Sequence, residues 1–144
     1  MIRDPARPGR SSLVWTAAHC LHAGREGGWF RNISFVPSFG ARGKSTAAFS
    51  SGSGTRLAPL GHWWADGAAT SDEWRAEGTV ADGAGAPFDF AVLHVTPPPG
   101  TQGRSLEEIV GAAVPVAFAS RPATVGELVI WGYPEGTDAT SLRL

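Results

Sequence analysis

The most informative segment of this chain reads Leu13-Val14-Trp15-Thr16-Ala17-Ala18-His19-Cys20. Residues 13–16 predict a short buried strand, because three successive apolar residues are typical of a strand covered on both faces. The residues from Ala17 to Leu21 predict a helical turn, whose small alanine side chains allow close packing. The segment therefore places His19 on a tight turn at the end of a strand.

A second apolar segment reads Phe88-Asp89-Phe90-Ala91-Val92-Leu93 and predicts the strongest strand of the chain, from Phe88 to Val95. Histidine is suited to proton transfer because its unperturbed pKa lies close to neutral pH. An aspartate that accepts the N–H of an imidazole ring fixes its tautomer and stabilises the imidazolium ion. These residue types could therefore form a general base, His19, with an orienting carboxylate, Asp89. Taken singly, however, a histidine in an alanine-rich turn is more often structural, and an aspartate before a strand is commonly a turn residue.

These two motifs, with the histidine before the aspartate, resemble those of the trypsin-like (chymotrypsin-fold) serine peptidases of the secreted bacterial branch. Further similarity lies in Pro8-Gly9-Arg10, in Phe35-Val36-Pro37 and in the segment from Gly126 to Pro134. The resemblance implies a serine-type endopeptidase that acts on proteins or peptides outside the cell and needs no cofactor. It assigns the base to His19 and the orienting carboxylate to Asp89.

The nucleophile of such a peptidase is expected in a Gly-Asp-Ser-Gly-Gly setting, which does not follow Asp89 in this sequence. The serines that follow Asp89 lack flanking glycines and a strained turn: Ser105, Ser120 and Ser141. Ser53 lies between Gly52 and Gly54 but precedes the aspartate, and we interpret it as part of a flexible loop. The resemblance therefore implies an N-terminal fragment that lacks the nucleophile and the first strands of its barrel. We expect this truncated chain to be inactive on its own.

Frequent turn-forming residues between short apolar runs favour an all-β fold, with 19 Gly and 11 Pro among 144 residues. The resemblance specifies a chymotrypsin-like antiparallel β-barrel. We expect an incomplete N-terminal barrel over residues 1–100, and a linker with the beginning of the second barrel over residues 101–144.

Local patterns predict further elements. A Ser105–Val110 helix is expected, with Ser105 as N-cap and Glu108 completing a capping box. A turn is expected at Asp66-Gly67, and a long Gly- and Ser-rich loop over residues 37–56. Strands are expected at Trp29–Val36, Gly61–Trp64, Trp74–Val80, Val114–Phe118 and Glu127–Trp131.

The charge and hydropathy patterns argue against a nucleic-acid partner, a membrane helix and a signal peptide. The formal net charge is −1, without a block of like charge, so no nucleic-acid partner is expected. No apolar run approaches the roughly 18 residues that a membrane helix needs. The segment from Met1 to Arg10 is polar and basic, so we do not interpret it as a signal peptide.

Cys20 is the single cysteine of the chain. Most lone cysteines are small buried hydrophobic residues, whereas the family resemblance implies one half of a disulfide whose partner is missing. A metal site is not expected, because His19-x-x-His22 is the closest approach to ligand spacing and has no third partner.

Two alternatives of other classes remain open. The segment from Ser38 to Ser45 nearly matches a phosphate-binding loop, in which Lys44 would contact phosphate oxygens and Ser45 would bind Mg²⁺. The chain could instead be a non-catalytic pseudoprotease or binding module, with His62-Trp63-Trp64 and the Gly/Ser loop as its contact surface.

Overall fold

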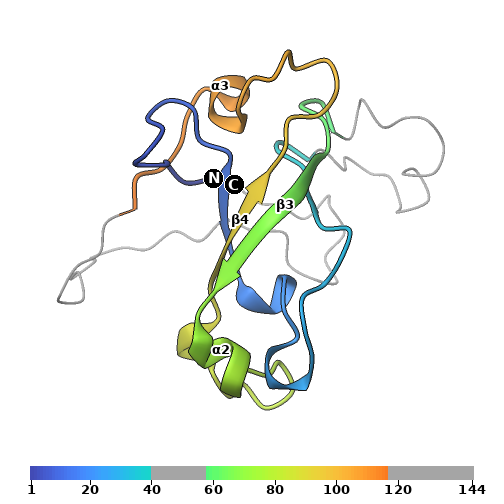
Figure 1. The fold of residues 1–144 in the computed structure, drawn as a ribbon, viewed down its shortest axis with the longest axis vertical. Helices are drawn as coiled ribbons and strands as arrows, with labels where there is room; N and C mark the ends of the chain where they lie inside the picture. The colour runs from blue at the N-terminus through green and yellow to red at the C-terminus, as the bar shows by residue number, and fades with distance from the viewer. Residues whose placement is uncertain (40–57, 117–144) are drawn as a thin grey trace, which may run out of the picture.

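The computed structural model describes residues 1–39 and 58–116, which form an antiparallel sheet of four strands in the order β1-β4-β3-β2. The strands are β1 (Leu13–Thr16), β2 (Ser34–Phe35), β3 (Trp63–Thr70) and β4 (Ala91–Val95). The sheet is a curled half-barrel in which β3 and β4 run side by side (Figure 1). The predicted all-β class is therefore confirmed.

The strand β4 alternates between the core and the outer face of the sheet. Ala91, Leu93 and Val95 are buried, and Val92 and His94 between them are partly exposed. This alternation has the period of two that a β-strand imposes on its side chains. The strand begins three residues later than predicted, because residues 86–88 form the 3₁₀ turn η4 (Ala86–Phe88).

The Asp66-Gly67 pair was expected to form a turn, but β3 continues through it. A β-bulge lies between Ala65, which pairs with Val95, and Gly67, which pairs with His94. The bulge lets the strand absorb Asp66 as an extra residue and resume pairing with β4. The prediction of a turn was wrong because hydrogen bonds to a neighbouring strand outweigh the local preference of Asp-Gly.

The expected strand over residues 74–80 is wrong, because this region begins with the helix α2 (Asp72–Glu77). The hydroxyl of Ser71 accepts a 3.0 Å hydrogen bond from the backbone N–H of Trp74 and caps the helix. The serine followed by two acidic residues was a local helix-start signal that the strand prediction overlooked. Trp74 is buried, so the helix contributes a large side chain to the core.

The core joins β-strands, turns and helices in one apolar cluster. Trp63 and Trp74 are its largest members, and Ala18 and Leu21 come from the turn that carries His19. The full cluster consists of Val14, Ala18, Leu21, Trp63, Trp74, Ala91, Leu93, Val95 and Leu106. The position of the His19 turn is therefore fixed by the same packing that stabilises the sheet.

The helix α3 (Leu106–Val110) carries the predicted capping box, with Ser105 and Glu108 bonded reciprocally. Its Glu107 accepts a 3.0 Å hydrogen bond from the backbone N–H of Ser11 and donates its own N–H to the Ser11 carbonyl at 2.8 Å. These bonds hold α3 against the segment that precedes β1. Residues 117–144, which include the predicted strand Glu127–Trp131, lie outside the described residues.

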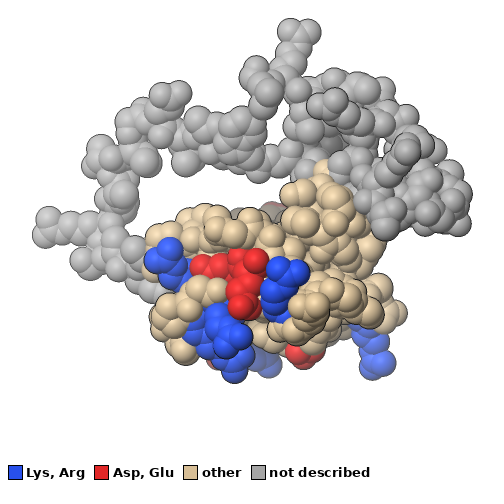
Figure 2. All heavy atoms as spheres, turned by 90° about the horizontal axis from the view of Figure 1, so that it is seen from above, with Lys and Arg blue, Asp and Glu red and all other residues tan. Residues whose placement is uncertain are grey.

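The surface at the α3 end of the sheet carries mixed charge. Figure 2 views the molecule from this end and shows acidic side chains bordered by basic ones. One such contact joins Arg10 Nε to Glu108 Oε1 at 3.5 Å. Among the described residues, no helix has the length and apolar character that crossing a membrane requires.

We predict that Trp63→Ala lowers the free energy of unfolding by about 3–5 kcal/mol, because Trp63 is fully buried and leaves a large cavity. The neighbouring Trp64 is 52% exposed and provides the matched control. Trp64→Ala should change stability by no more than about 1 kcal/mol. Urea unfolding followed by circular dichroism measures both values, and equal losses would contradict this description of the core.

Candidate functional site

His19 lies on the 3₁₀ turn η1 (Ala18–Cys20), directly after β1. The backbone N–H groups of Leu21 and His22 both donate to the carbonyl of Ala18, at 2.8 and 2.9 Å. Ala18 and Leu21 are buried in the core, whereas His19 points out of it with a side chain that is 42% exposed. The predicted strand and the predicted turn are both present, and together they hold the histidine at the surface. The expectation that the strand is covered on both faces was wrong, because Val14 is buried in the core while Trp15 faces outward and is 42% exposed.

Asp89 lies between η4 and β4, and its backbone is held by the end of β3. The hydroxyl of Thr70 donates to the carbonyl of Phe90 at 2.7 Å, and the hydroxyl of Ser71 donates to the carbonyl of Phe88 at 3.4 Å. The residues on both sides of Asp89 are therefore fixed by the last side chain of β3 and by the N-cap of α2. Sequence analysis did not identify this role of Thr70 and Ser71, because only strand pairing brings them close.

The structure brings His19 and Asp89 together. Thr16 at the end of β1 pairs with Ala91 at the start of β4, so the two residues meet at the same edge of the sheet although they are 70 positions apart. The Nδ1 atom of His19 lies 2.6 Å from Oδ2 of Asp89. The backbone N–H of His19 donates to the other carboxylate oxygen, Oδ1, at 2.9 Å. Both oxygens of the aspartate thus bind the same histidine.

This arrangement selects one tautomer of the imidazole ring. An ionised carboxylate can only accept hydrogen bonds, so Nδ1 of His19 must donate to Asp89. In the neutral ring, the lone pair then lies on Nε2, the nitrogen on the opposite side. An imidazole held in this way can take a proton at Nε2, and Asp89 stabilises the resulting cation.

The surroundings of Asp89 favour its ionised form. Partial burial raises the pKa of the carboxyl group, but this effect is outweighed by the backbone of Ala18 together with three contributions from His19. These are the hydrogen bonds from its ring and its backbone N–H, and the attraction of its charge when it is protonated. The pKa of Asp89 consequently lies below its ordinary value, as a carboxylate that balances an imidazolium requires.

Two aromatic rings stack beside the pair. Trp15 of β1 and Phe90 lie with ring centroids 5.6 Å apart and an angle of 17° between their planes. Phe90 directly follows Asp89, so this contact connects the start of β4 to the strand that precedes His19. Such cross-strand contacts stabilise the local pairing of strands.

A second His–Asp pair, which sequence analysis missed, lies on the sheet. Nδ1 of His94 is 2.5 Å from Oδ1 of Asp66, and both side chains are about half exposed, at 42% and 46%. The bulge in β3 places Asp66 near His94 on the neighbouring strand. The sequence carries no local pattern that pairs Asp66 with His94, because the contact depends on the register of β3 against β4.

The other predicted residues have different outcomes. Cys20 is exposed, which excludes the alternative of a small buried hydrophobic residue, because η1 turns its side chain away from the core. The missing disulfide partner that the resemblance implies stays a prediction. Ser105 is buried as the N-cap of α3 and donates its hydroxyl to Glu108 at 2.8 Å. The remaining residues lie outside the described part of the chain: Lys44, Ser45, Ser53, Ser120 and Ser141.

His22 has a structural environment and is not part of the site. It is buried, its Nδ1 accepts the backbone N–H of Gly24 at 3.0 Å, and its ring packs edge-on against Trp29. Within residues 1–39 and 58–116, no group of three His, Cys, Asp or Glu side chains is arranged to hold a metal ion.

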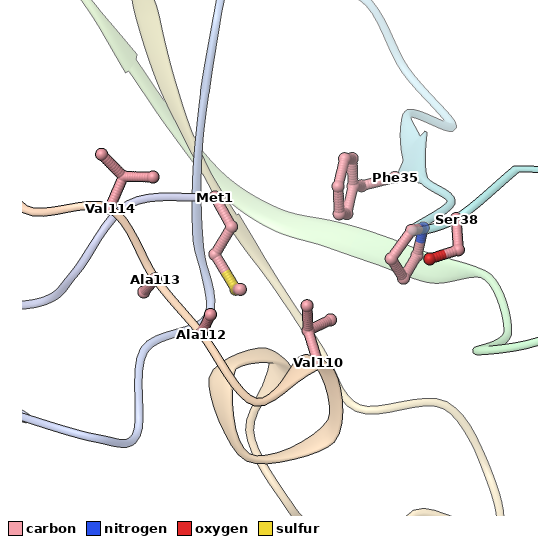
Figure 3. Close-up of a pocket in the computed structure, with 8 residues that line it drawn as sticks. Met1, Phe35, Ser38, Val110, Ala112, Ala113 and Val114 are labelled. Carbon is pink, nitrogen blue, oxygen red and sulfur yellow. The ribbon is translucent and has the colours of Figure 1, made fainter.

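A cavity of about 350 Å³ lies between the end of α3 and β2, away from His19 and Asp89. Figure 3 shows the side chains of Met1, Phe35 and Val110 around it. Its lining is mostly apolar and contains no acidic or basic side chain. The cavity therefore offers no acidic or basic side chain for proton transfer.

Comparison with solved structures identifies two proteases of similar fold. One is the thermostable serine protease AL20 from an extremophilic microorganism, with 30% sequence identity over 78% of this chain and a TM-score of 0.53. The other is the protease Anisep from Arthrobacter nicotinovorans, with 25% identity over 78% of this chain and a TM-score of 0.55. No protein-family model and no curated protein sequence matches the chain.

The match covers only part of the larger proteins. The chain spans 41% of the length of AL20 and 40% of the length of Anisep. Within the matched region the half-barrel sheet is shared, which confirms the chymotrypsin-like fold expected from the two motifs. The chain is therefore structurally related to the bacterial serine proteases of chymotrypsin-like fold.

Proposed function

We propose that this chain provides the general base and the orienting carboxylate of a secreted serine endopeptidase that hydrolyses peptide bonds in proteins. The observation that carries the proposal is the double contact of Asp89 with the ring and the backbone N–H of His19. This contact leaves Nε2 of a half-exposed ring as the proton acceptor. The fold shared with two solved proteases supports the same function.

In the proposed mechanism, Nε2 of His19 removes the proton from a serine hydroxyl as its oxygen attacks the carbonyl carbon of the substrate. Asp89 keeps Nδ1 protonated and balances the positive charge that develops on the ring. The imidazolium then donates its proton to the nitrogen of the leaving amine, and the C–N bond breaks. A water molecule, activated by the same base, hydrolyses the acyl-enzyme.

The nucleophile of this mechanism is not assigned to a described residue. Within the part of the chain that the structure describes, the ring of His19 is hydrogen-bonded to Asp89 and to no serine. Loss of the serine from a triad typically reduces turnover by a factor on the order of 10⁶. Since no serine after Asp89 has the expected glycine-rich setting, we propose that the serine and the oxyanion hole lie outside residues 1–144, and we expect a protein made of these residues alone to be inactive.

The test uses the complete gene product that contains this chain, assayed with fluorescently labelled casein. Asp89→Asn should reduce kcat by about 10⁴-fold, because an amide in place of the carboxylate no longer fixes the productive tautomer. Asp66→Asn is the matched control, since it alters the second His–Asp pair, and its kcat should remain at the wild-type level. A folded gene product without turnover would instead support a non-catalytic binding module.

The low pKa of Asp89 also predicts a pH dependence of stability. Its folded-state pKa lies below the unfolded value of about 3.9, so the ionised group stabilises the fold above about pH 4. This contribution is lost as the pH falls through the folded-state pKa. Urea unfolding of wild type and Asp89→Asn should show a stability difference at pH 7 that shrinks below about pH 4. A difference that is constant with pH would contradict the assigned ionisation.

A further inference from the structure

Three glycines meet where the segment that follows His19 packs against the segment that precedes Asp89. Gly24 opens the 3₁₀ turn η2 (Gly24–Glu26), Gly78 follows α2, and Gly85 precedes η4. Gly24 and Gly78 are buried, and Gly85 is partly exposed. We call these three residues the glycine contact.

The backbones in this contact are too close for any side chain. A Cβ atom on Gly24 would lie 1.9 Å from the carbonyl oxygen of Gly78, and a Cβ atom on Gly85 would lie 2.7 Å from the Gly78 Cα. Both distances are shorter than the 3.0 Å below which real Cβ contacts essentially do not occur. Gly24 and Gly85 also have φ angles of +67° and +75°, which favour glycine.

Hydrogen bonds join the same two segments around the glycine contact. The backbone N–H of Arg25 donates to the carbonyl of Gly78 at 2.9 Å, and the indole N–H of Trp74 donates to the carbonyl of His22 at 3.1 Å. The hydroxyl of the buried Thr79 donates to Glu26 at 3.2 Å. These hydrogen bonds form only when the two segments lie close together, and the absence of side chains at the glycines permits that distance.

The His19–Asp89 pair depends on such external support. The two side chains are 42% and 23% exposed, so burial alone does not fix their separation. A hydrogen bond of 2.6 Å weakens when its partners move apart by a fraction of an ångström. The segments next to both residues must consequently be held together by other contacts.

We propose that Gly24, Gly78 and Gly85 are positioning residues, which hold the turn of His19 against the turn of Asp89. This inference rests on the proposed function, because it assigns the glycines to the geometry of that site. The geometry of the His19–Asp89 pair is measurable by NMR without peptidase activity.

Gly83 provides a matched control within the same loop. Its φ angle is +70°, close to those of Gly24 and Gly85, but a Cβ atom on Gly83 would meet no atom within 4 Å. Gly83→Ala therefore imposes a similar backbone strain without separating the two segments. Gly85→Ala imposes the strain and also forces Gly78 away.

The experiment compares isotope-labelled wild type, Gly85→Ala and Gly83→Ala by NMR. Imidazole nitrogen shifts of His19 report whether Nδ1 remains the hydrogen-bonded donor, and side-chain carbon shifts give the pKa of Asp89. In Gly85→Ala we expect the hydrogen-bonded signal of His19 to be lost and the pKa of Asp89 to rise towards its ordinary value. The imidazole nitrogen shifts of His94, which is bonded to Asp66, should be the same in all three proteins. The His19 shifts of Gly83→Ala should match those of the wild type.

A folded Gly85→Ala protein with unchanged His19 and Asp89 signals would overturn the proposal, as would an equal change in Gly83→Ala. If Gly85→Ala does not fold, amide hydrogen exchange of the wild type tests whether the glycine contact and the His19–Asp89 pair are coupled. The amides of Arg25 and His19 should then open together, while those between β3 and β4 stay protected. Protection of the His19 amide after the Arg25 amide has opened would contradict the coupling. If the NMR or hydrogen-exchange results match these expectations but the complete gene product has no peptidase activity, the proposed function is rejected and the positioning role of the glycines is retained.

Discussion

The pairing of β1 with β4 is the constraint on which the site depends. Its register sets Thr16 opposite Ala91, so the turn after β1 and the turn before β4 emerge at the same edge of the sheet. A slip of one residue would move the alternating side chains of β4 to the opposite face and expose Leu93 and Val95. The apolar core therefore penalises any register other than the one that brings His19 to Asp89.

The two His–Asp pairs of this chain show what the surrounding backbone adds to the same side-chain chemistry. Both pairs have an Nδ1–carboxylate contact at similar distance and a half-exposed imidazole. Asp89 also accepts a hydrogen bond from the backbone N–H of His19, and its flanking carbonyls are bonded to Thr70 and Ser71. His94 and Asp66 instead meet across two neighbouring strands at a bulge. A short His–Asp contact is thus insufficient to indicate a site without the elements that hold it.

Local sequence patterns predicted the elements whose stability is mainly local. The strand at Leu13–Thr16 and the capping box of α3 were predicted with the correct residues, because an apolar run and a Ser-x-x-Glu cap are short-range signals. The turn expected at Asp66-Gly67 was wrong because the conformation there depends on a distant partner, the strand β4. The strand expected at residues 74–80 was wrong although the Ser71 cap is a local signal for a helix. Pairing with β4 carries β3 through the bulge, and burial of Trp74 against the core favours the helix α2.

The sequence alone determined the two motifs and the chemistry expected of them, because residue types and short spacings encode a base, a carboxylate and the strands that carry them. Tertiary structure decided that His19 and Asp89 meet, since their contact depends on a strand register between segments 70 residues apart. It also decided the close approach of Gly24, Gly78 and Gly85, which no local pattern distinguishes from ordinary loop glycines. The physical reason is that backbone separation and strand register are set by packing over the whole core, whereas side-chain chemistry is a property of each residue.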